Sequence, residues 1–275
     1  ILFLALIVVL LPVIYIVSSS FSSAEAVSTG RVLLWPVDFS LEGYKTVFEY
    51  RSIVSGFANT FFYTIVGTAI NIVMTIAAAY PLSRRRLFGK NQIMFLFTFT
   101  MIFSGGLIPN YMLIMDLRML NTRWAILLPG AIGVYNLIIA RTFFQSNIPE
   151  ELYEAASIDG CTHLFFLTRV VLPLSKPIIA VLILYYAVGH WNAYFNAFIY
   201  LSDQALFPLQ IILREILVLN TVDSALIVDP QLAAAKQGLS DLLKYSLIVV
   251  SSVPFLIAYP FVSKHFAKGA LTGAV

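Results

Sequence analysis

The sequence predicts an all-α, polytopic membrane protein. Hydrophobic residues make up 60% of the 275 residues and charged residues only 11%, whereas a soluble domain carries about 25% charged residues. Mean hydropathy is +0.88, and apolar runs of the roughly 20 residues that cross a bilayer core recur along the chain. These runs lack the alternation, in segments of about ten residues, that a membrane β-barrel requires. Residues 1–275 are therefore expected to form one transmembrane domain.

Six transmembrane helices are expected from these apolar runs. The first run has no basic n-region, so it is interpreted as a membrane span and not as a signal peptide. The second is expected to stop at Pro81, just before a basic loop. The six predicted spans are residues 1–17, 60–80, 93–115, 124–144, 177–200 and 242–262.

Basic residues in a short loop predict the orientation. The loop between the second and third spans contains Arg84, Arg85, Arg86 and Lys90 and no acidic residue. Short loops rich in Lys and Arg stay in the cytoplasm. The polar segment of residues 145–176 lies two spans further along the chain, so it is expected on the same, cytoplasmic side.

Charge and cysteine content argue against other classes of protein. The formal net charge of +3 gives no indication of a nucleic-acid partner. Cys161 is the one cysteine of the sequence, which excludes an intrachain disulfide and a metal cluster held by several cysteines. The three histidines do not form a metal-ligand pattern, so no metal site is expected.

The segment of residues 145–176 predicts a helical hairpin that projects from the membrane. Asn147 is expected to cap its first helix. Gly160 can end that helix in a left-handed conformation. Thr162 can cap a second helix, which is expected to end before Leu172-Pro173.

Three residues of the first hairpin helix favour docking of a partner. Ala155 and Ala156 are small, so another surface can approach closely, and Glu154 offers a charge-assisted hydrogen bond to that surface. The alternative is a plain amphipathic connector that joins two spans and binds nothing.

One long pattern resembles a known family. Its parts are Glu154-Ala155-Ala156, then three residues, Gly160, nine residues, Val170, one residue and Leu172-Pro173. The pattern resembles the coupling-loop signature of permease subunits in bacterial ABC importers, with Val170 where isoleucine is common. Among these the chain is most similar to maltose-type carbohydrate permeases of the oligosaccharide and polysaccharide branch. The supporting stretches are Tyr135-Asn136-Leu137, Phe143-Phe144, Pro149-Glu150-Glu151-Leu152 and Trp191-Asn192.

The resemblance implies an ATP-driven importer of oligo- or polysaccharides in the bacterial inner membrane. In such importers the permease pairs with a second, homologous permease, two ATPase subunits attach below, and an extracytoplasmic solute-binding protein docks above. The chain would form half of the translocation pathway and receive the motion of the ATPase through its coupling loop. The implied ATPase contacts are Glu154, Ala155, Ala156 and Gly160, with Leu172 and Pro173 setting the return into the membrane.

The chain is not expected to be an enzyme. It has no Gly-x-x-x-x-Gly-Lys-Ser/Thr phosphate-binding loop. ATP and Mg²⁺ are therefore expected on the partner ATPase, and no cofactor is expected on this chain.

Polar and aromatic residues inside the predicted spans mark the expected substrate pathway, because polar groups there are costly and often functional. Asn192 and Asn196 are four residues apart and are expected to share a helix face. A helix break is expected at Ser104-Gly105-Gly106. The alternative is hydrogen bonding between helices, which uses the same residue types. The candidates are Trp191, Asn192, Tyr194, Asn196, Asn71 and Asn110.

Other kinds of membrane protein agree less well with the sequence. An ion-coupled secondary transporter often relies on an ionisable relay in the membrane, and none of the 14 Asp and Glu residues falls well inside a predicted span. An intramembrane enzyme would need a catalytic motif, and the hydrolase and metalloprotease patterns are absent. A structural scaffold would not need the coupling loop. An ABC importer permease for a solute other than a sugar remains the nearest alternative.

Overall fold

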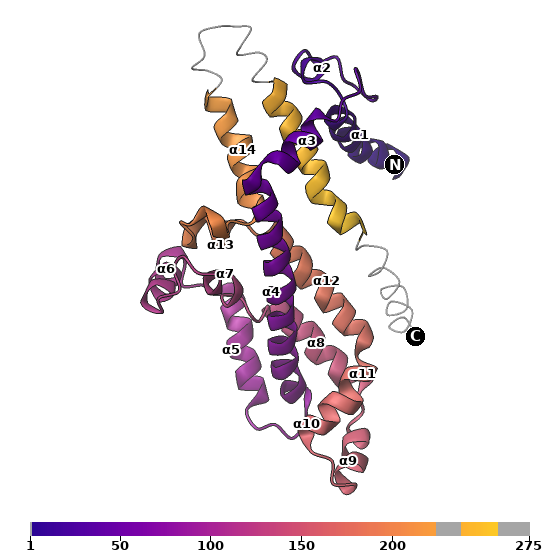
Figure 1. Ribbon diagram of the computed structural model, residues 1–275. Coiled ribbons are helices and arrows are strands. Elements are labelled where there is room, and N and C mark those ends of the chain that lie inside the picture. Colours follow the sequence, from indigo (N-terminus) through magenta and orange to yellow (C-terminus); the bar gives the residue numbers. More distant parts are fainter. Residues whose placement is uncertain (1, 224–237, 258–275) are drawn as a thin grey trace. The chain divides into compact units, whose positions relative to one another are not determined.

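The computed structural model describes residues 2–223 and 238–257, which form helices and no strand (Figure 1). These residues divide into two compact units. The first comprises residues 2–60, 203–223 and 238–257, and the second comprises residues 61–202.

Three described helices are long and apolar enough to cross a membrane by themselves: α1 (Leu2–Ser20), α4 (Arg51–Ser83) and the helix Gly238–Ile257. Two further pairs of helices pass the same test only as bent spans. One pair is α5 (Lys90–Ile102) with α6 (Leu107–Asp116), bent by 115°. The other is His163–Leu174 with α12 (Lys176–Asn192), bent by 83°.

The break in the predicted third span is confirmed. Helix α5 ends at Ile102 and α6 begins at Leu107. Gly106 adopts φ 87° between them, which a side chain would disfavour. The Ser104 hydroxyl accepts a hydrogen bond from the Gly106 N–H at 3.2 Å and so satisfies one backbone donor of the break.

The predicted fourth span, residues 124–144, is not one continuous helix. It consists of α7 (Trp124–Leu127) and α8 (Val134–Asn147), separated by six non-helical residues. Pro129 has no N–H to donate, and Gly130 lies in the left-handed region at φ 79°. Both residues favour an interruption, which the hydropathy of the run conceals.

The ends of the second, fifth and sixth predicted spans also differ from expectation. Helix α4 does not stop at Pro81 but continues to Ser83. Helix α12 ends at Asn192, and a short helix, α13 (Phe195–Tyr200), follows. The described part of the sixth helix begins at Gly238, ahead of the predicted residue 242, and predicted residues 258–262 lie outside the described chain.

The first unit contains α1, α2 (Ala24–Ser28), α3 (Glu42–Glu49), residues 51–60 of α4, η2 (Gln204–Leu206), α14 (Leu209–Asp223) and the helix Gly238–Ile257. Polar side chains of α4 form hydrogen bonds with the backbone at and before the start of α14. The Asn59 amide donates to the carbonyls of Ala205 at 2.7 Å and Phe207 at 3.1 Å. The Thr60 hydroxyl accepts from the Leu209 N–H at 2.8 Å, which caps α14. Its buried apolar core is Val47, Ile53, Leu209, Ile212, Leu243 and Leu247.

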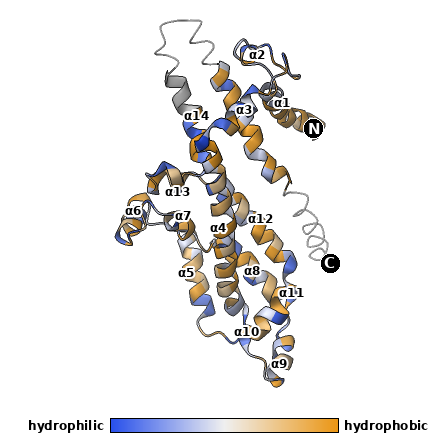
Figure 2. Cartoon of the chain, in the orientation of Figure 1, coloured by the Kyte–Doolittle hydropathy of each residue, from blue (hydrophilic) through white to orange (hydrophobic). Residues whose placement is uncertain are grey.

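The second unit buries a larger apolar core around α8. Leu137, Ala140 and Phe144 follow the spacing of one helix face and are all almost completely buried. Figure 2 shows that α4, α8 and α12 are largely hydrophobic. The C-terminal end of α4 is capped by Arg141, whose Nε donates to the Leu82 carbonyl at 3.0 Å.

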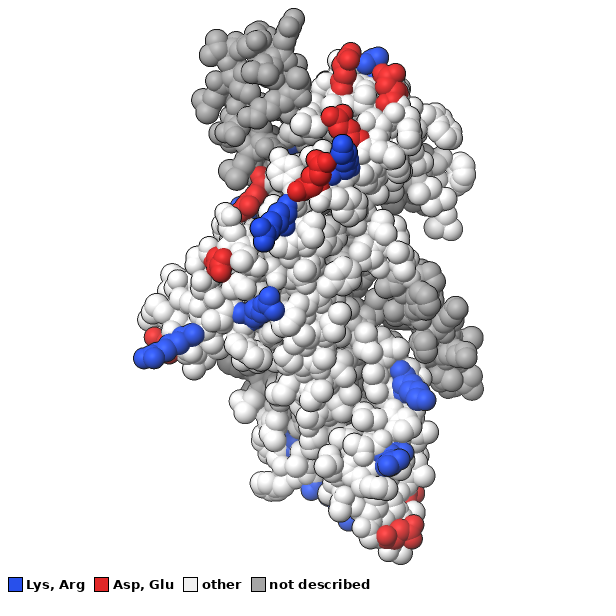
Figure 3. All heavy atoms as spheres, in the orientation of Figure 1, with Lys and Arg blue, Asp and Glu red and all other residues white. Residues whose placement is uncertain are grey.

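The remaining helices of the second unit form an arm beyond α8. They are α9 (Glu150–Ile158), α10 (His163–Phe166), the π-helical turn η1 (Leu167–Val171) and α11 (Leu172–Leu174). On the face drawn in Figure 3, charged side chains of this unit gather around the arm and around α6 and α7, and the surface between them carries few charges.

Candidate functional site

Backbone geometry builds the hairpin of residues 149–175. Helix α9 ends in a Schellman turn, in which the Gly160 N–H donates to the Ser157 carbonyl at 3.1 Å and the Cys161 N–H donates to the Ala156 carbonyl at 3.0 Å. Gly160 takes φ 75°, as the sequence predicted. The Thr162 hydroxyl then accepts from the Phe165 N–H at 3.3 Å, so the predicted cap of the second helix is also confirmed.

Two local predictions about this hairpin are wrong. Asn147 does not cap α9: it ends α8, and its amide donates to the Phe143 carbonyl at 3.2 Å. The N-cap position of α9 is Pro149. The residue before a proline disfavours helical geometry, so α8 stops at Asn147 and does not run on into α9.

The second hairpin helix does not stop before Leu172-Pro173 either. Helical structure continues to Leu174, and the bend lies at Ser175. The preceding π-helical turn changes the hydrogen-bond register, and Pro173 occupies a first-turn position where its missing N–H costs little.

Arg84 is the main anchor between α4 and the hairpin. The residue is buried, and its Nη1 lies 3.5 Å from the Glu150 Oε2. Its guanidinium carbon lies 4.8 Å from the ring centre of Tyr80, 5.4 Å from that of Phe166 and 5.8 Å from that of Tyr153. An arginine enclosed by one carboxylate and three rings holds the end of α4, α9 and α10 together.

The anchor is incompletely hydrogen-bonded. Among the described residues, Arg84 Nε, Arg84 Nη2 and Glu150 Oε1 are buried without a hydrogen-bond partner. The pair therefore uses one contact where a guanidinium and a carboxylate can form two.

Tyr153 and His163 connect the two helices of the hairpin. Their rings stack at 4.6 Å with an interplanar angle of 13°, and the Tyr153 hydroxyl lies 2.8 Å from His163 Nε2. Tyr153 also packs edge-on against Phe166, with ring centres 5.3 Å apart. These contacts link the exposed hairpin to the buried core at Phe166.

The predicted contact residues of the hairpin differ in exposure. Glu154 is exposed and pairs with exposed Arg86 at 3.2 Å. Ala155 and Gly160 are also exposed, whereas Ala156 is half-buried and packs against the core cluster around α8. Leu172, half-buried, packs against the same cluster, and Pro173 is exposed.

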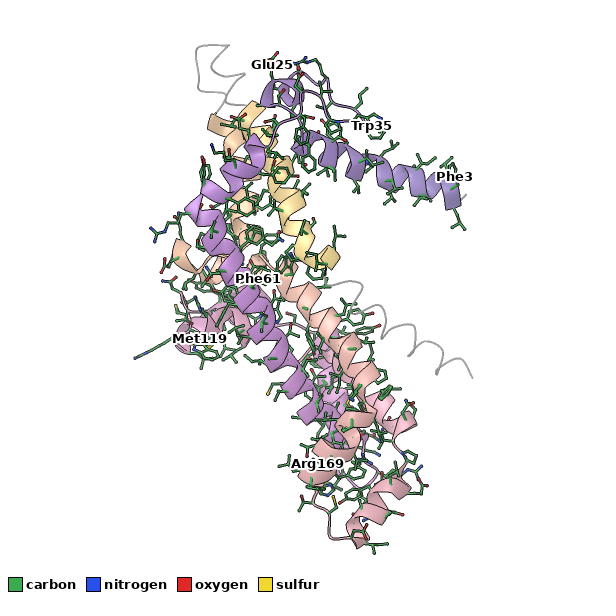
Figure 4. All side chains as sticks on the ribbon, turned by 45° about the vertical axis from the view of Figure 1, so that its right-hand side comes forward. Phe3, Glu25, Trp35, Phe61, Met119 and Arg169 are labelled. Carbon is green, nitrogen blue, oxygen red and sulfur yellow. The ribbon has the colours of Figure 1, made fainter. Side chains whose placement is uncertain are left out.

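Large apolar side chains add to the exposed surface of the hairpin. Ile158 is 87% exposed and Leu164 is 71% exposed, and Phe165 and Leu152 are also exposed. Exposed apolar side chains grouped on one element are typical of a surface that a partner covers. Arg169, labelled in Figure 4, lies on the same arm with its guanidinium carbon 5.8 Å from the Phe165 ring centre.

Two cavities of the second unit meet at the break between α7 and α8. One has a volume of about 220 Å³ and the other about 540 Å³, and Pro129, Gly130 and Asn196 line both. Asn71 lines the smaller cavity and Asn110 lines the larger one. Three of the predicted pathway residues, Asn71, Asn110 and Asn196, therefore line these two cavities.

The other pathway candidates lie differently. Trp191 is buried and packs edge-on against Phe61, which is labelled in Figure 4, with ring centres 5.1 Å apart. Tyr194 is exposed, and Asn192 is exposed with its amide donating to the Val188 carbonyl at 2.9 Å.

The expected shared face of Asn192 and Asn196 is wrong. The helix ends at Asn192 and restarts at Phe195, so the four-residue helical spacing does not apply across the break.

With this geometry in hand, comparison with known proteins identifies the family. The family described as "Binding-protein-dependent transport system inner membrane component" matches residues 50–270. The chain belongs to this permease family. The predicted resemblance to ABC importer permeases and the inner-membrane location are therefore confirmed.

Two curated relatives of this permease are proteins of Bacillus subtilis (strain 168). The chain is 43% identical over 266 residues to the polygalacturonan/rhamnogalacturonan transport system permease protein YtcP, covering 96% of this chain and 92% of the relative. It is 41% identical over 269 residues to protein LplC, covering 98% and 90%.

A solved structure shares the permease fold. It is a chain of a bacterial ABC transporter involved in the import of the acidic polysaccharide alginate, with a TM-score of 0.87 and 35% sequence identity. The match covers 96% of this permease and 93% of that chain. The all-α polytopic fold is therefore confirmed.

Sequence reasoning missed the anchor of the permease hairpin. The basic loop as a whole predicts orientation and does not distinguish Arg84, which is buried, from Arg86, whose side chain is 72% exposed. The available signal was its place directly after the end of an apolar span, where a side chain can still reach back into the core.

Proposed function

We propose that this permease is the transmembrane subunit of an ATP-driven importer of oligo- or polysaccharides. It forms half of the translocation pathway and receives the motion of an ATPase through its coupling hairpin. Family membership supports transport, and relatives named for polygalacturonan, rhamnogalacturonan and alginate support a carbohydrate substrate.

The observation that carries the proposal is the construction of the hairpin. Helix α9 has no buried residue of its own, yet Arg84 and Tyr153 tie it to the end of α4 and to Phe166. A partner that moved the exposed face of α9 would therefore act on a transmembrane helix through short, specific contacts.

The proposed topology has six spans with the hairpin in the cytoplasm. The broken helices α7 and α8 together make the fourth span, and the basic loop at Arg84 to Lys90 favours a cytoplasmic location for the hairpin that contacts it. Glu154, Ala155, Ala156 and Gly160 are proposed to contact the ATPase.

The proposed partners are a second, homologous permease, two ATPase subunits and an extracytoplasmic solute-binding protein. ATP and Mg²⁺ bind to the ATPase subunits, which carry out the hydrolysis. This permease receives force, binds no cofactor and catalyses no reaction.

Charge reversal at the hairpin tests the proposal. In membranes containing the co-expressed transporter, Glu154→Lys is expected to abolish ATPase co-purification and carbohydrate uptake, because it reverses an exposed charge on the docking face. Gly160→Val is expected to do the same, since a β-branched residue is strained at φ 75°. Glu42→Lys, which reverses an acidic residue of α3, is the matched control. Wild-type co-purification and uptake in Glu154→Lys and Gly160→Val would contradict the proposal.

The energy source separates the two transport classes. Uptake is expected to require ATP and to persist when ion gradients are collapsed. Uptake that follows an ion gradient without ATP would instead support the ion-coupled alternative. ATP-dependent uptake of a non-carbohydrate alone would retain the ABC mechanism and overturn the substrate class.

A further inference from the structure

The break between α7 and α8 exposes backbone groups inside an apolar span. Residues 128–133 are non-helical, so their N–H and C=O groups need partners outside the usual helical pattern. In a membrane such a segment is tolerated where protein groups or a cavity satisfy it. Here side chains from α4 and α12 supply the partners.

Asn71 clamps the carbonyl side of the break. Its Nδ2 donates to the carbonyls of Gly130 at 3.0 Å and Ala131 at 2.9 Å. This fixes the orientation of the amide, so its Oδ1 faces His190 Nε2 at 2.6 Å. Because an amide oxygen only accepts, His190 Nε2 must be the donor.

Close packing holds His190 in that position. A Cβ added to Gly67 would lie 2.5 Å from the His190 ring, closer than real Cβ atoms approach. A glycine at this position of α4 therefore allows the ring to reach Asn71.

Tyr186 clamps the N–H side of the break. The Gly133 N–H donates to the Tyr186 hydroxyl at 3.0 Å, and that hydroxyl lies 2.6 Å from the Thr75 hydroxyl. The Tyr186 oxygen accepts from Gly133, and either hydroxyl of the Tyr186–Thr75 pair can donate to the other. The clamp thus joins α4, α12 and the start of α8.

We propose that Asn71, His190, Tyr186 and Thr75 are positioning residues that hold residues 128–133 as a fixed wall of the substrate pathway. This segment faces both cavities, because Pro129 and Gly130 line each of them. This inference rests on the proposed transport function and assigns these side chains a role through the backbone, not through direct contact with the sugar.

Hydrogen-bonding capacity supports this assignment. Both donors of the Asn71 amide and one lone pair of its oxygen are already used, which leaves a single acceptor position for a substrate. Asn196, which lines both cavities, is the better placed of the predicted amides to meet a hydroxyl group.

Thiol labelling of the wall tests the inference in the assembled transporter. The background is Cys161→Ser, which removes the one native cysteine, and Ala131→Cys places a thiol in the wall. Asn71→Leu and Tyr186→Phe are each expected to change the labelling rate by about tenfold or more, because the first removes two hydrogen bonds to the wall and the second removes one. Thr75→Val is expected to change it less, and Thr100→Val, at an exposed residue of α5, not at all.

Transport kinetics supply the second measurement. Asn71→Leu is expected to lower maximal uptake by about tenfold or more with little change in apparent KM, because a displaced wall impairs passage rather than recognition. His190→Gln keeps a donor for Asn71 and is expected to retain uptake, whereas His190→Leu is expected to resemble Asn71→Leu.

Two results would overturn the inference. One is unchanged labelling in Asn71→Leu and Tyr186→Phe. The other is a raised KM with unchanged labelling in Asn71→Leu, which would make Asn71 a direct substrate contact. If Asn71→Leu fails to accumulate in membranes, the labelling rate in Tyr186→Phe, which loses only one hydroxyl, tests the inference instead. Labelling reports on the wall even if the transported solute is not a carbohydrate.

Discussion

At the scale of single residues, burial separates neighbouring arginines. Arg84 and Arg86 are two positions apart, and each pairs with a glutamate of α9. The Arg84 side chain is 8% exposed and the Arg86 side chain 72% exposed. An exposed ion pair contributes about 0–1 kcal/mol, whereas breaking a buried pair strands a charge away from water.

Replacing Arg84 is expected to be costly. Arg84→Met leaves Glu150, whose side chain is only 17% exposed, without its cation, so the stability of the purified complex should fall by up to about 3–5 kcal/mol, measured by thermal or denaturant unfolding. Arg86→Ala is the matched control and should change stability by less than about 1 kcal/mol. The double variant Arg84→Met/Glu150→Leu should recover much of the loss. Equal effects of the two single substitutions would show that Arg84 is not an anchor.

At the scale of elements, helix approach depends on particular glycines. A Cβ added to Gly56 of α4 would lie 2.5 Å from Ile212 Cδ1 and 3.2 Å from the Leu209 Cα. Ile212 is the end of a flexible side chain, but Leu209 Cα is backbone at the start of α14. The contact therefore leaves little room for relaxation.

A side chain at Gly56 is expected to force α4 and α14 apart. Gly56→Val should lower stability by about 1–3 kcal/mol through overpacking. Gly189→Ala is the control, because a Cβ there meets nothing within 4 Å inside α12. That substitution should be neutral or stabilising by up to about 1 kcal/mol. Thermal unfolding of both variants checks the pair, and a stable Gly56→Val would refute the close-packing argument.

Local chemistry predicted some elements of the fold and not others. The break near Gly106 and the turn at Gly160 followed from glycines that adopt positive φ, one directly before α6 and one after the end of α9. The break in residues 128–133 was missed because the surrounding run is uniformly apolar. Its stability comes from Asn71 and Tyr186, which lie more than 50 positions away in sequence.

The same reasoning explains the candidate site. Much of the hairpin was predictable because the turn at Gly160, the cap at Thr162 and the signature lie within one short segment. Its anchor was not, because the pairing of Arg84 with Glu150 joins the end of α4 to the start of α9, 66 positions apart in sequence. Spacing in sequence gives no information about such a contact.

At the scale of the whole molecule, much of the apolar surface requires an external solvent or partner. Only 11% of the most apolar stretch of α1 is buried within the described chain, and Val9 is 65% exposed. Such a helix has to be covered by lipid or by another permease, which agrees with a subunit of an inner-membrane assembly.

A charge in α1 is expected to prevent its insertion. Val9→Asp places a carboxylate near the centre of the helix, at a cost of about 2.5–3.5 kcal/mol on the insertion scale. The inserted fraction should fall clearly in a membrane-insertion assay, while Val9→Ala should insert normally. Normal insertion of Val9→Asp would indicate that a partner or a water-filled space shields this position.

The Schellman turn of the hairpin has a practical consequence. Cys161, the one thiol of the sequence, is the residue directly after Gly160 and is partly accessible. A fluorophore or spin label coupled to the unaltered chain would therefore sit at the tip of the element proposed to receive force. Cys161 is thus a native labelling site, and a label attached there could report the binding of an ATPase in real time without any substitution.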